Sequence, residues 1–396
     1  NPWFAPRGRC SALRVAPAPA WAQGAGKPGG TAGAGLQAWK PSAPLYGQFV
    51  KAVATRYSGH YRPAGQRTAL PKVSYWEIFN EPNFIEDLAP VSSQADMYRG
   101  LLAAAWPGLK GHGNTVLFGS LAFGGGGETA PLAFVRQLYC LDGGYHSLRG
   151  RTASQHGCPS KGGFRAKNPA LFSAGGFAMH PYPLAVNQTV PPNRTRAHNP
   201  DFVAFSQLPN LIKTLDRVTK AYGSGKRYNV WNDEYGYITN PPNSVGVTLN
   251  NQALYLNWAE YLSWKNPRIA SFHQFLLGDP PPKAISGSGF DSGLLTYTGV
   301  PKPAYNAWRL PLYLPVSATR KGRSLEVWGC VRPAQYAARD THQKQVGHIQ
   351  FRANGSAGFK NIGAPVTFRN PNGSCYFDRH IKFPSSGTVQ ITYQYP

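Results

Sequence analysis

The chain has 396 residues, and 42% of them are hydrophobic, which is enough to form the core of one large and one small domain. It carries 41 basic and 17 acidic residues, and its net charge of +24 favours nonspecific adsorption to polyanions. The sequence shows no zinc-finger spacing, basic-region helix or aromatic-basic pattern, so it does not indicate a specific nucleic-acid binder. It also has no run of 18 consecutive apolar residues, so we predict no membrane span.

The first half of the chain alternates strand-like and helical patterns. The helix over residues 46–57 is predicted because Phe49, Val53 and Tyr57 recur at intervals of four. A segment rich in Gly, Pro and Ala over residues 24–40 is interpreted as a linker. The other predicted elements in this half are strands over 12–22, 73–79, 115–123 and 172–179, and helices over 94–109 and 131–139.

The alternation continues to about residue 279. We predict helices over 208–222 and 250–265, and strands over 228–231 and 269–277. Repeated strand-then-helix units indicate an α/β fold, in which helices surround a parallel sheet that is closed or open.

From about Pro315 the pattern changes to short alternating strands separated by turns such as Asn354-Gly355 and Asn372-Gly373. This pattern favours a small C-terminal β-sandwich. We therefore divide the chain into a catalytic domain over 1–315 and a sandwich domain over 316–396.

The five cysteines show no metal-binding spacing, so we predict no metal site. In a secreted protein, Cys140 would pair with Cys158 and Cys330 with Cys375, leaving Cys10 over. The chain begins at Asn1, without an initiator Met or a signal peptide. We therefore expect a processed precursor or a fragment.

Polar side chains stand at the ends of the predicted strands. The strand that contains Trp76 ends on Asn80-Glu81-Pro82, and a later one is followed by Glu234. A Glu at a strand end can be a cap or an ion-pair partner, and these structural roles are as frequent as catalytic ones. Two carboxylates that face each other across a sugar, however, are what glycoside hydrolysis needs. The other polar strand ends carry His180 with Tyr182, Tyr235 and Gln274.

The segments 76–83 and 231–236 together resemble the two catalytic segments of glycoside hydrolase clan A. Within that clan, His180-Pro181-Tyr182 and the stretch 293–309 resemble family 39-like and family 5-like proteins of actinobacteria. The resemblance implies a TIM (β/α)8 barrel and a retaining mechanism. By this count residues 12–22 form strand three, so the first strands are missing.

The resemblance also implies roles for individual residues. Glu81 would be the general acid/base and Glu234 the nucleophile, while Asn80 would bind the sugar 2-hydroxyl. His180 and Tyr182 would orient Glu234 or the substrate, with a purely structural histidine as the less favoured alternative for His180. Three further residues are assigned to the substrate site. Trp231 and Tyr235 would be stacking platforms, and core packing is the alternative for Trp231. Gln274 has no defined role.

Asp233 replaces the Thr that is more usual before the nucleophile, and we expect a small effect because neighbouring strand residues point to opposite faces. The hypothesis is a secreted, monomeric, cofactor-free retaining glycoside hydrolase whose partner is a carbohydrate substrate. The alternative is a noncatalytic carbohydrate-binding or cell-wall adhesion protein on the same scaffold.

Overall fold

The computed structural model describes residues 18–124, 128–159, 162–183, 189–281, 290–369 and 373–396. The chain forms two compact units. The first unit comprises Asn1–Tyr235 and Pro267–Gln274, and the second comprises Gly236–Asn266 and Phe275–Pro396. The boundary predicted after residue 315 is a different division and stays a prediction.

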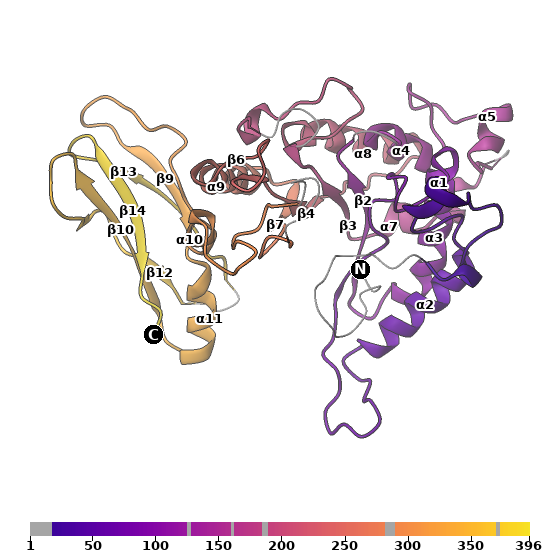
Figure 1. Ribbon diagram of the computed structural model, residues 1–396, viewed down its shortest axis with the longest axis horizontal. Helices are drawn as coiled ribbons and strands as arrows, with labels where there is room; N and C mark the ends of the chain where they lie inside the picture. Colours follow the sequence, from indigo (N-terminus) through magenta and orange to yellow (C-terminus); the bar gives the residue numbers. More distant parts are fainter. Residues whose placement is uncertain (1–17, 125–127, 160–161, 184–188, 282–289, 370–372) are drawn as a thin grey trace. The chain divides into compact units, whose positions relative to one another are not determined.

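The first unit is built on a parallel sheet of five strands (Figure 1). Its strand order is β1-β2-β3-β4-β7, so the order of the strands in the sheet is the same as their order along the chain. β2 and β3 are almost continuously buried, as expected when both faces of a parallel sheet are covered. The strands are β1 (Tyr75–Glu77), β2 (Thr115–Ala122), β3 (Gly176–His180), β4 (Val230–Tyr235) and β7 (Ile269–Gln274).

This sheet is strongly curled. The rings of Tyr75 on β1 and Trp231 on β4 lie 5.4 Å apart, although β2 and β3 run between these strands. In a flat sheet, three strand spacings would separate them by about 14 Å. The sheet therefore curves like half of a barrel, which is consistent with a partial TIM barrel.

Four long helices of the first unit confirm the helices predicted there. α2 begins three residues before the predicted start because the Oγ of Ser42 accepts a hydrogen bond from the N–H of Leu45 and Pro44 lies in the first turn. α3 has the predicted bounds. These helices are α2 (Ala43–Arg56), α3 (Gln94–Leu109), α4 (Pro131–Leu138) and α8 (Leu208–Ala221).

The first unit also contains short helical segments that the sequence patterns did not predict. They are α1 (Gly30–Ala34), α5 (Gly150–Gln155), α6 (Phe164–Lys167), α7 (Ala170–Ser173), and the 3-10 helices η1 (Ala20–Ala22), η2 (Val91–Ser93), η4 (Pro192–Arg194) and η5 (Phe205–Gln207). α1 lies inside the predicted linker, so part of that segment is helical.

Two predicted strands need correction. In the strand predicted over 12–22, residues 12–17 lie outside the described residues, and Ala20–Ala22 form a 3-10 turn that follows Pro19. In the strand predicted over 172–179, Phe172 belongs to α7, and β3 begins only at Gly176. Gly175, just before β3, packs closely against β2, since a Cβ there would lie 2.6 Å from the side chain of Thr115.

The second unit contains the predicted long helix α9 (Leu249–Lys265) and, towards the C-terminus, two antiparallel sheets. Residues of both sheets contribute to one apolar cluster, with Val327 on β9, Ile349 on β10 and Phe377 on β13. The β-sandwich itself stays a prediction, and Asn372 of the predicted turn lies outside the described residues. The other elements are β5 (Thr239–Asn240), β6 (Val247–Thr248), α10 (Pro303–Arg309), β8 (Leu312–Tyr313), β9 (Leu325–Cys330), α11 (Arg332–Thr341), β10 (Gln345–Ala353), β11 (Lys360–Asn361), β12 (Val366–Phe368), β13 (Tyr376–Ile381) and β14 (Gly387–Tyr393).

Helix α11 is missing from the sequence prediction, which expected only strands in this region. Ala334, Ala337 and Ala338 are buried at helical spacing, and Ala334 belongs to the apolar cluster. Because alanine is small and only weakly hydrophobic, the helical period of this segment is weak in the sequence.

Both predicted disulfides are confirmed. Cys140 bonds to Cys158 in the first unit, and Cys330 bonds to Cys375 in the second. Cys10 lies outside the described residues. Within the described ranges, no helix combines the length and hydropathy that crossing a membrane requires.

Candidate active site

The turn after β1 holds Glu81 in an uncommon backbone conformation. Phe79, Glu81 and Ser120 have φ angles of 67°, 39° and 50°, in the left-handed region that non-glycine residues rarely adopt. The backbone N–H of Glu81 donates a hydrogen bond to the carbonyl oxygen of Ser120, at 2.9 Å. Such strained residues cluster at functional sites, because the surrounding structure must hold them in place.

Asn83 anchors this turn to the end of β2. Its Nδ2 donates to the carbonyl oxygens of Ala122 and Thr129, both at 3.1 Å, and its Oδ1 accepts from the N–H of Ala122 at 2.8 Å. The side chain is fully buried. Asn83 therefore fixes the position of Glu81, a role that sequence analysis missed although the residue stands in the Asn-Glu-Pro-Asn motif.

His180, at the end of β3, lies at the centre of the candidate site. Its Nδ1 lies 2.8 Å from Oε1 of Glu81 and 3.4 Å from Oε2 of Glu234. Its Nε2 lies 3.1 Å from Oγ of Ser120 and 3.6 Å from Oδ1 of Asp233. The ring, 1% exposed, thus joins β1, β2, β3 and β4 at their carboxyl ends.

The surrounding carboxylates control the charge of His180. Burial opposes its charged form, but the negative charges of Glu234 and Asp233 and the hydrogen bonds to Asp233 and Glu81 raise the pKa of His180 well above its usual value. These contacts therefore favour the protonated imidazole, in which both ring nitrogens are hydrogen-bond donors. It holds the two predicted catalytic carboxylates on one side of the ring.

Glu234 is held by a second donor. The hydroxyl of Tyr182 donates a hydrogen bond to Oε2 of Glu234 at 3.1 Å, and Tyr182 itself is buried. Burial raises the pKa of Glu234, the charges of Glu81 and Asp233 raise it further, and His180 and Tyr182 oppose this rise. One carboxylate oxygen of Glu81, one of Glu234 and a ring nitrogen of His180 all lie within 4.8 Å of one another.

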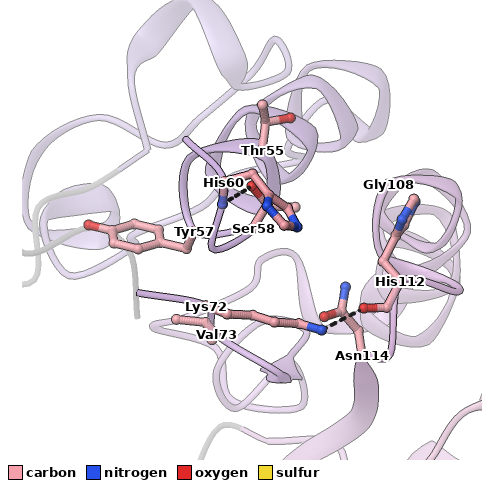
Figure 2. A pocket seen from close by; sticks show the side chains of 10 residues that line it. Thr55, Tyr57, Ser58, His60, Lys72, Val73, Gly108, His112 and Asn114 are labelled. Carbon is pink, nitrogen blue, oxygen red and sulfur yellow. Dashed lines mark hydrogen bonds between the residues drawn. The ribbon is translucent and has the colours of Figure 1, made fainter. Parts of the chain in front are cut away.

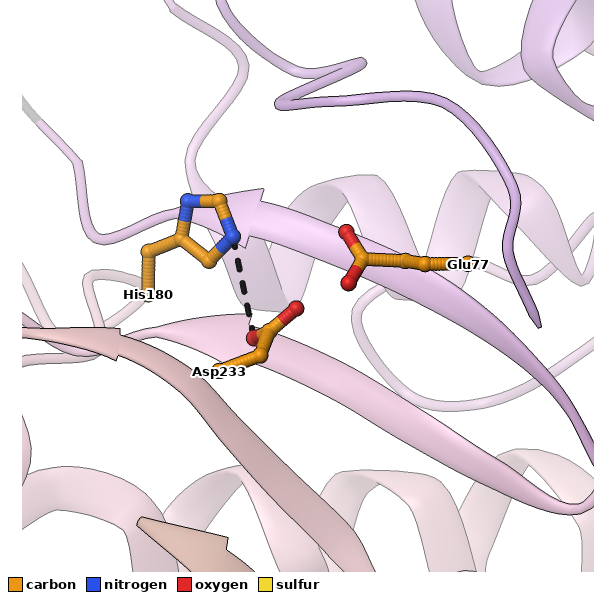
Figure 3. Close-up of side chains that lie close together, drawn as sticks. All are labelled: Glu77, His180 and Asp233. Atoms are coloured by element: carbon orange, nitrogen blue, oxygen red, sulfur yellow. Dashed lines mark ion pairs between the residues drawn. The ribbon is translucent and has the colours of Figure 1, made fainter. Parts of the chain in front are cut away.

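A second carboxyl pair lies at the opposite side of the His180 ring. Figure 3 shows the carboxyl group of Glu77 directed toward Asp233 and His180. Although Glu77 as a residue is solvent-exposed, the burial of its carboxyl group and a hydrogen bond with Asp233 raise its pKa well above the usual value. Burial opposes ionisation of Asp233, but His180 and the hydrogen bond with Glu77 lower its pKa. These opposite shifts are typical of two neighbouring carboxyl groups that share one proton.

The expectation that Asp233 and Glu234 point to opposite faces is wrong, whereas the small effect expected of Asp233 stays a prediction. Asp233 and Glu234 both reach His180, and the charge of Asp233 contributes to the raised pKa of Glu234. The reason is an irregularity in the pairing of β4 with β7 between Asn232 and Tyr235, which breaks the strict alternation of faces.

Asn80 contacts a carboxyl group that sequence analysis did not single out. Its Nδ2 donates to Oδ2 of Asp87 at 3.3 Å. Burial, followed by the negative charge of Glu81, raises the pKa of Asp87 to about 7. Asp87 therefore titrates near neutral pH beside the candidate catalytic acid, and only the folded turn reveals this.

The remaining predicted site residues are not part of this cluster. Trp231 lies on the concave face of the sheet against Tyr75. Tyr235 is fully buried, and its ring packs against those of Phe205 and Phe272. Gln274 is partly exposed at the end of β7, where it pairs in register with Tyr235.

The same side chains form two groups of possible cation ligands. The two sets of clustered donor atoms are Glu77 with His180 and Asp233, and Glu81 with His180 and Glu234. Both ring nitrogens of His180 contact protein groups, Nδ1 the carboxylate of Glu81 and Nε2 the hydroxyl of Ser120. We assign none of these residues as a metal ligand, and the absence of metal and cofactor stays a prediction.

No protein-family model matches the chain, and no curated protein matches its sequence. Among solved structures, the chain is similar to a GH39 enzyme from Xanthomonas axonopodis pv. citri, at 15% identity over 89% of this chain and 73% of the other, with a TM-score of 0.43. It is also similar to a GH128 endo-beta-1,3-glucanase from Sorangium cellulosum, at 17% identity over 65% and 74% of the two chains, with a TM-score of 0.36.

A beta-glucuronidase from Faecalibacterium prausnitzii is similar at 13% identity over 67% of this chain, with a TM-score of 0.35. The chain spans 34% of that protein's length, about a third. These solved structures are glycoside hydrolases, but at such identities and TM-scores the similarities carry no argument about family or activity.

Proposed function

We propose that the protein is a retaining glycoside hydrolase that uses Glu81 and Glu234. The observation that carries the proposal is that both carboxylates meet at His180, with one oxygen of Glu81 and one of Glu234 within 4.8 Å of each other. Retaining enzymes place the two carboxyl groups about 5–5.5 Å apart, closer than the about 6.5–9.5 Å that inverting enzymes need to admit a water molecule. A close pair of this kind is consistent with direct attack by a carboxylate.

The proposed reaction has two displacements. An oxygen of Glu234 attacks the anomeric carbon while Glu81 transfers its proton to the leaving glycosidic oxygen. The glycosyl-enzyme ester is then cleaved by water, which gives a proton to Glu81 as its oxygen bonds to the anomeric carbon. Both carboxylates leave the cycle as they entered it.

The neighbouring side chains fit this cycle. The positive charge of His180 and the hydrogen bond from Tyr182 keep Glu234 oriented and favour its ionised form before attack. Asn80 stands beside Glu81 and can turn its amide to the sugar 2-hydroxyl. Glu81 and Glu234 keep side-chain exposures of 20% and 27%, so both remain accessible to a sugar.

The finer features of the hypothesis belong to the same proposal. They are a (β/α)8 barrel whose first strands are missing, a C-terminal β-sandwich, a family 39-like or family 5-like enzyme, and a secreted monomer with a carbohydrate substrate. The two disulfides support an oxidising compartment. Trp231, Tyr235 and Gln274 remain proposed substrate residues.

The test compares the wild type with Glu81→Gln and Glu81→Ala on a panel of aryl glycosides and polysaccharides. Glu81→Gln is expected to abolish hydrolysis of substrates with poor leaving groups. Azide should restore turnover to Glu81→Ala, because a small anion can attack the intermediate without base assistance. NMR of the first product should show retained anomeric configuration.

The matched control is Glu86→Gln, which removes the same charge at an exposed position five residues away. Glu86→Gln should keep wild-type turnover. Equal turnover in Glu81→Gln and the wild type would refute the assignment, and glycan binding without turnover in the wild type would support the noncatalytic alternative.

A further inference from the structure

A cavity of about 360 Å³ lies in the first unit at the amino end of the parallel sheet (Figure 2). It is bordered by the end of α2, the segment before β1 and the segment between α3 and β2. Asn114 lines it and directly precedes β2, whereas Ser120, near the other end of β2, contacts His180. Six residues of extended chain span about 20 Å, so the cavity is separate from the candidate active site.

The lining of this cavity carries cationic and neutral polar groups and no carboxylate. Lys72, His60 and His112 all border it, and Figure 2 shows the Lys72 side chain and the His60 ring on opposite sides of the space. The contrast with the candidate active site is complete, because there several carboxylates surround one imidazolium. An electropositive space of this kind attracts anions.

Hydrogen-bond donors remain to meet such an anion. The Nζ of Lys72 donates to the carbonyl oxygen of His112 at 2.8 Å, which holds the ammonium at the cavity and leaves two of its N–H bonds for a ligand. The Oγ of Ser58 accepts from the N–H of His60 at 3.3 Å, so the hydroxyl proton of Ser58 can be donated. An imidazole donates an N–H in either charge state.

Gly113 keeps room for the ammonium. A Cβ at this position would lie 3.2 Å from Nζ of Lys72, and the φ of Gly113 is +67°, which disfavours other residues. The backbone thus allows Lys72 to reach the cavity and hold its position.

We propose that this cavity binds one oxyanion group, a sulfate, phosphate or carboxylate, at a site distinct from the candidate active site. Lys72 supplies the charge, and Ser58, His60 and His112 supply neutral or charged donors. The net charge of +24 raises the local concentration of such anions at the surface, while the cavity selects where one of them is held. This binding does not depend on the proposed hydrolysis.

The test uses the full chain with isotope-labelled histidine and follows ring NMR signals during titration with inorganic sulfate, inorganic phosphate, D-glucuronate or glucose. The signals of His60 and His112 should shift saturably with at least one of the three anions and not with glucose, and the anion that binds most tightly identifies the group. Lys72→Gln should weaken that binding about tenfold, the loss expected for a charge-assisted hydrogen bond.

Lys213→Gln, on the exposed side of α8, removes the same charge elsewhere and should leave the affinity unchanged. Ser58→Ala should weaken binding less than Lys72→Gln, because it removes a neutral donor. Equal affinity in Lys72→Gln and Lys213→Gln, or linear shifts that never saturate, would overturn the proposal and leave only nonspecific ion screening.

Discussion

The two units each bury an ionic cluster, and the clusters differ in charge balance. In the second unit, Nζ of Lys302 lies 2.8 Å from Asp279, 2.9 Å from Oγ1 of Thr239 and 3.2 Å from the carbonyl oxygen of Asp291. The side chains of Lys302 and Asp279 are 1% and 4% exposed. The ammonium therefore pairs with the carboxylate of Asp279, while burial and the charge of Asp279 raise the pKa of the nearby Asp291 carboxyl group.

In the first unit, several carboxyl groups surround one cation. Within the described part of the chain, Glu81, Asp233 and Glu234 share the cation His180, and Glu77 adds a further carboxyl group. A balanced pair holds segments together, whereas an excess of one charge shifts pKa values and leaves groups ready to exchange protons. The comparison predicts that the second cluster mainly stabilises the fold, and it is consistent with the catalytic role proposed for the first.

The largest contrast is expected from Glu234→Gln. Activity should fall about 10³-fold or more, equivalent to about 4 kcal/mol of transition-state stabilisation. The melting temperature should stay constant or rise, because the substitution removes one of several crowded carboxylates. Measurements of kcat/KM and of thermal unfolding check this, and a loss of both activity and stability would contradict the separation between the two clusters.

Lys302→Met should have the opposite signature. Leaving Asp279 buried without its cation should destabilise the fold by about 3–5 kcal/mol, as for other broken buried pairs. Urea-induced unfolding measures this loss. The double variant Lys302→Met with Asp279→Leu should recover part of it, and a loss below about 1 kcal/mol in the single variant would show that the pair is not structural.

Asp87 should make the stability of the fold pH-dependent. Its pKa is about 7 in the folded protein against an ordinary value of 3.8, so the folded state holds a proton that the unfolded state has lost. Stability from this group is therefore full below about pH 4 and declines as the pH rises to about 7. Asp87→Asn should remove a decline of roughly 2–4 kcal/mol in denaturation curves between those pH values.

A parallel pH dependence in the wild type and in Asp87→Asn would contradict this assignment. Asp96→Asn is the matched control, because Asp96 is paired with Arg99 at 2.9 Å and lies outside the cluster.

Tyr182→Phe should have the smallest effect. It removes the hydrogen bond that opposes the raised pKa of Glu234, so the acidic limb of the pH–rate profile should move to higher pH. We expect about a tenfold loss of kcat/KM at neutral pH, the usual value of one charge-assisted hydrogen bond. An unchanged profile with reduced stability would assign Tyr182 to packing alone.

Sequence reasoning predicted the elements whose signals are local. α3 has the predicted bounds because its apolar period is regular, and both disulfides follow from chain order. It also singled out Glu81, His180 and Glu234, which the structure brings together at His180. It missed Glu77, Asp87 and Asn83, because none of them is distinctive until the sheet curls and the turn after β1 folds back onto β2.

The sequence by itself determined which residues can act as acids, bases and cysteine partners, since these properties are carried by single side chains and short motifs. Tertiary structure decided their pairing and their charge. The irregular pairing of β4 turns both Asp233 and Glu234 toward His180, and the curl of the sheet brings Glu77 to the same ring. Such effects depend on distances between strands, which no local pattern encodes.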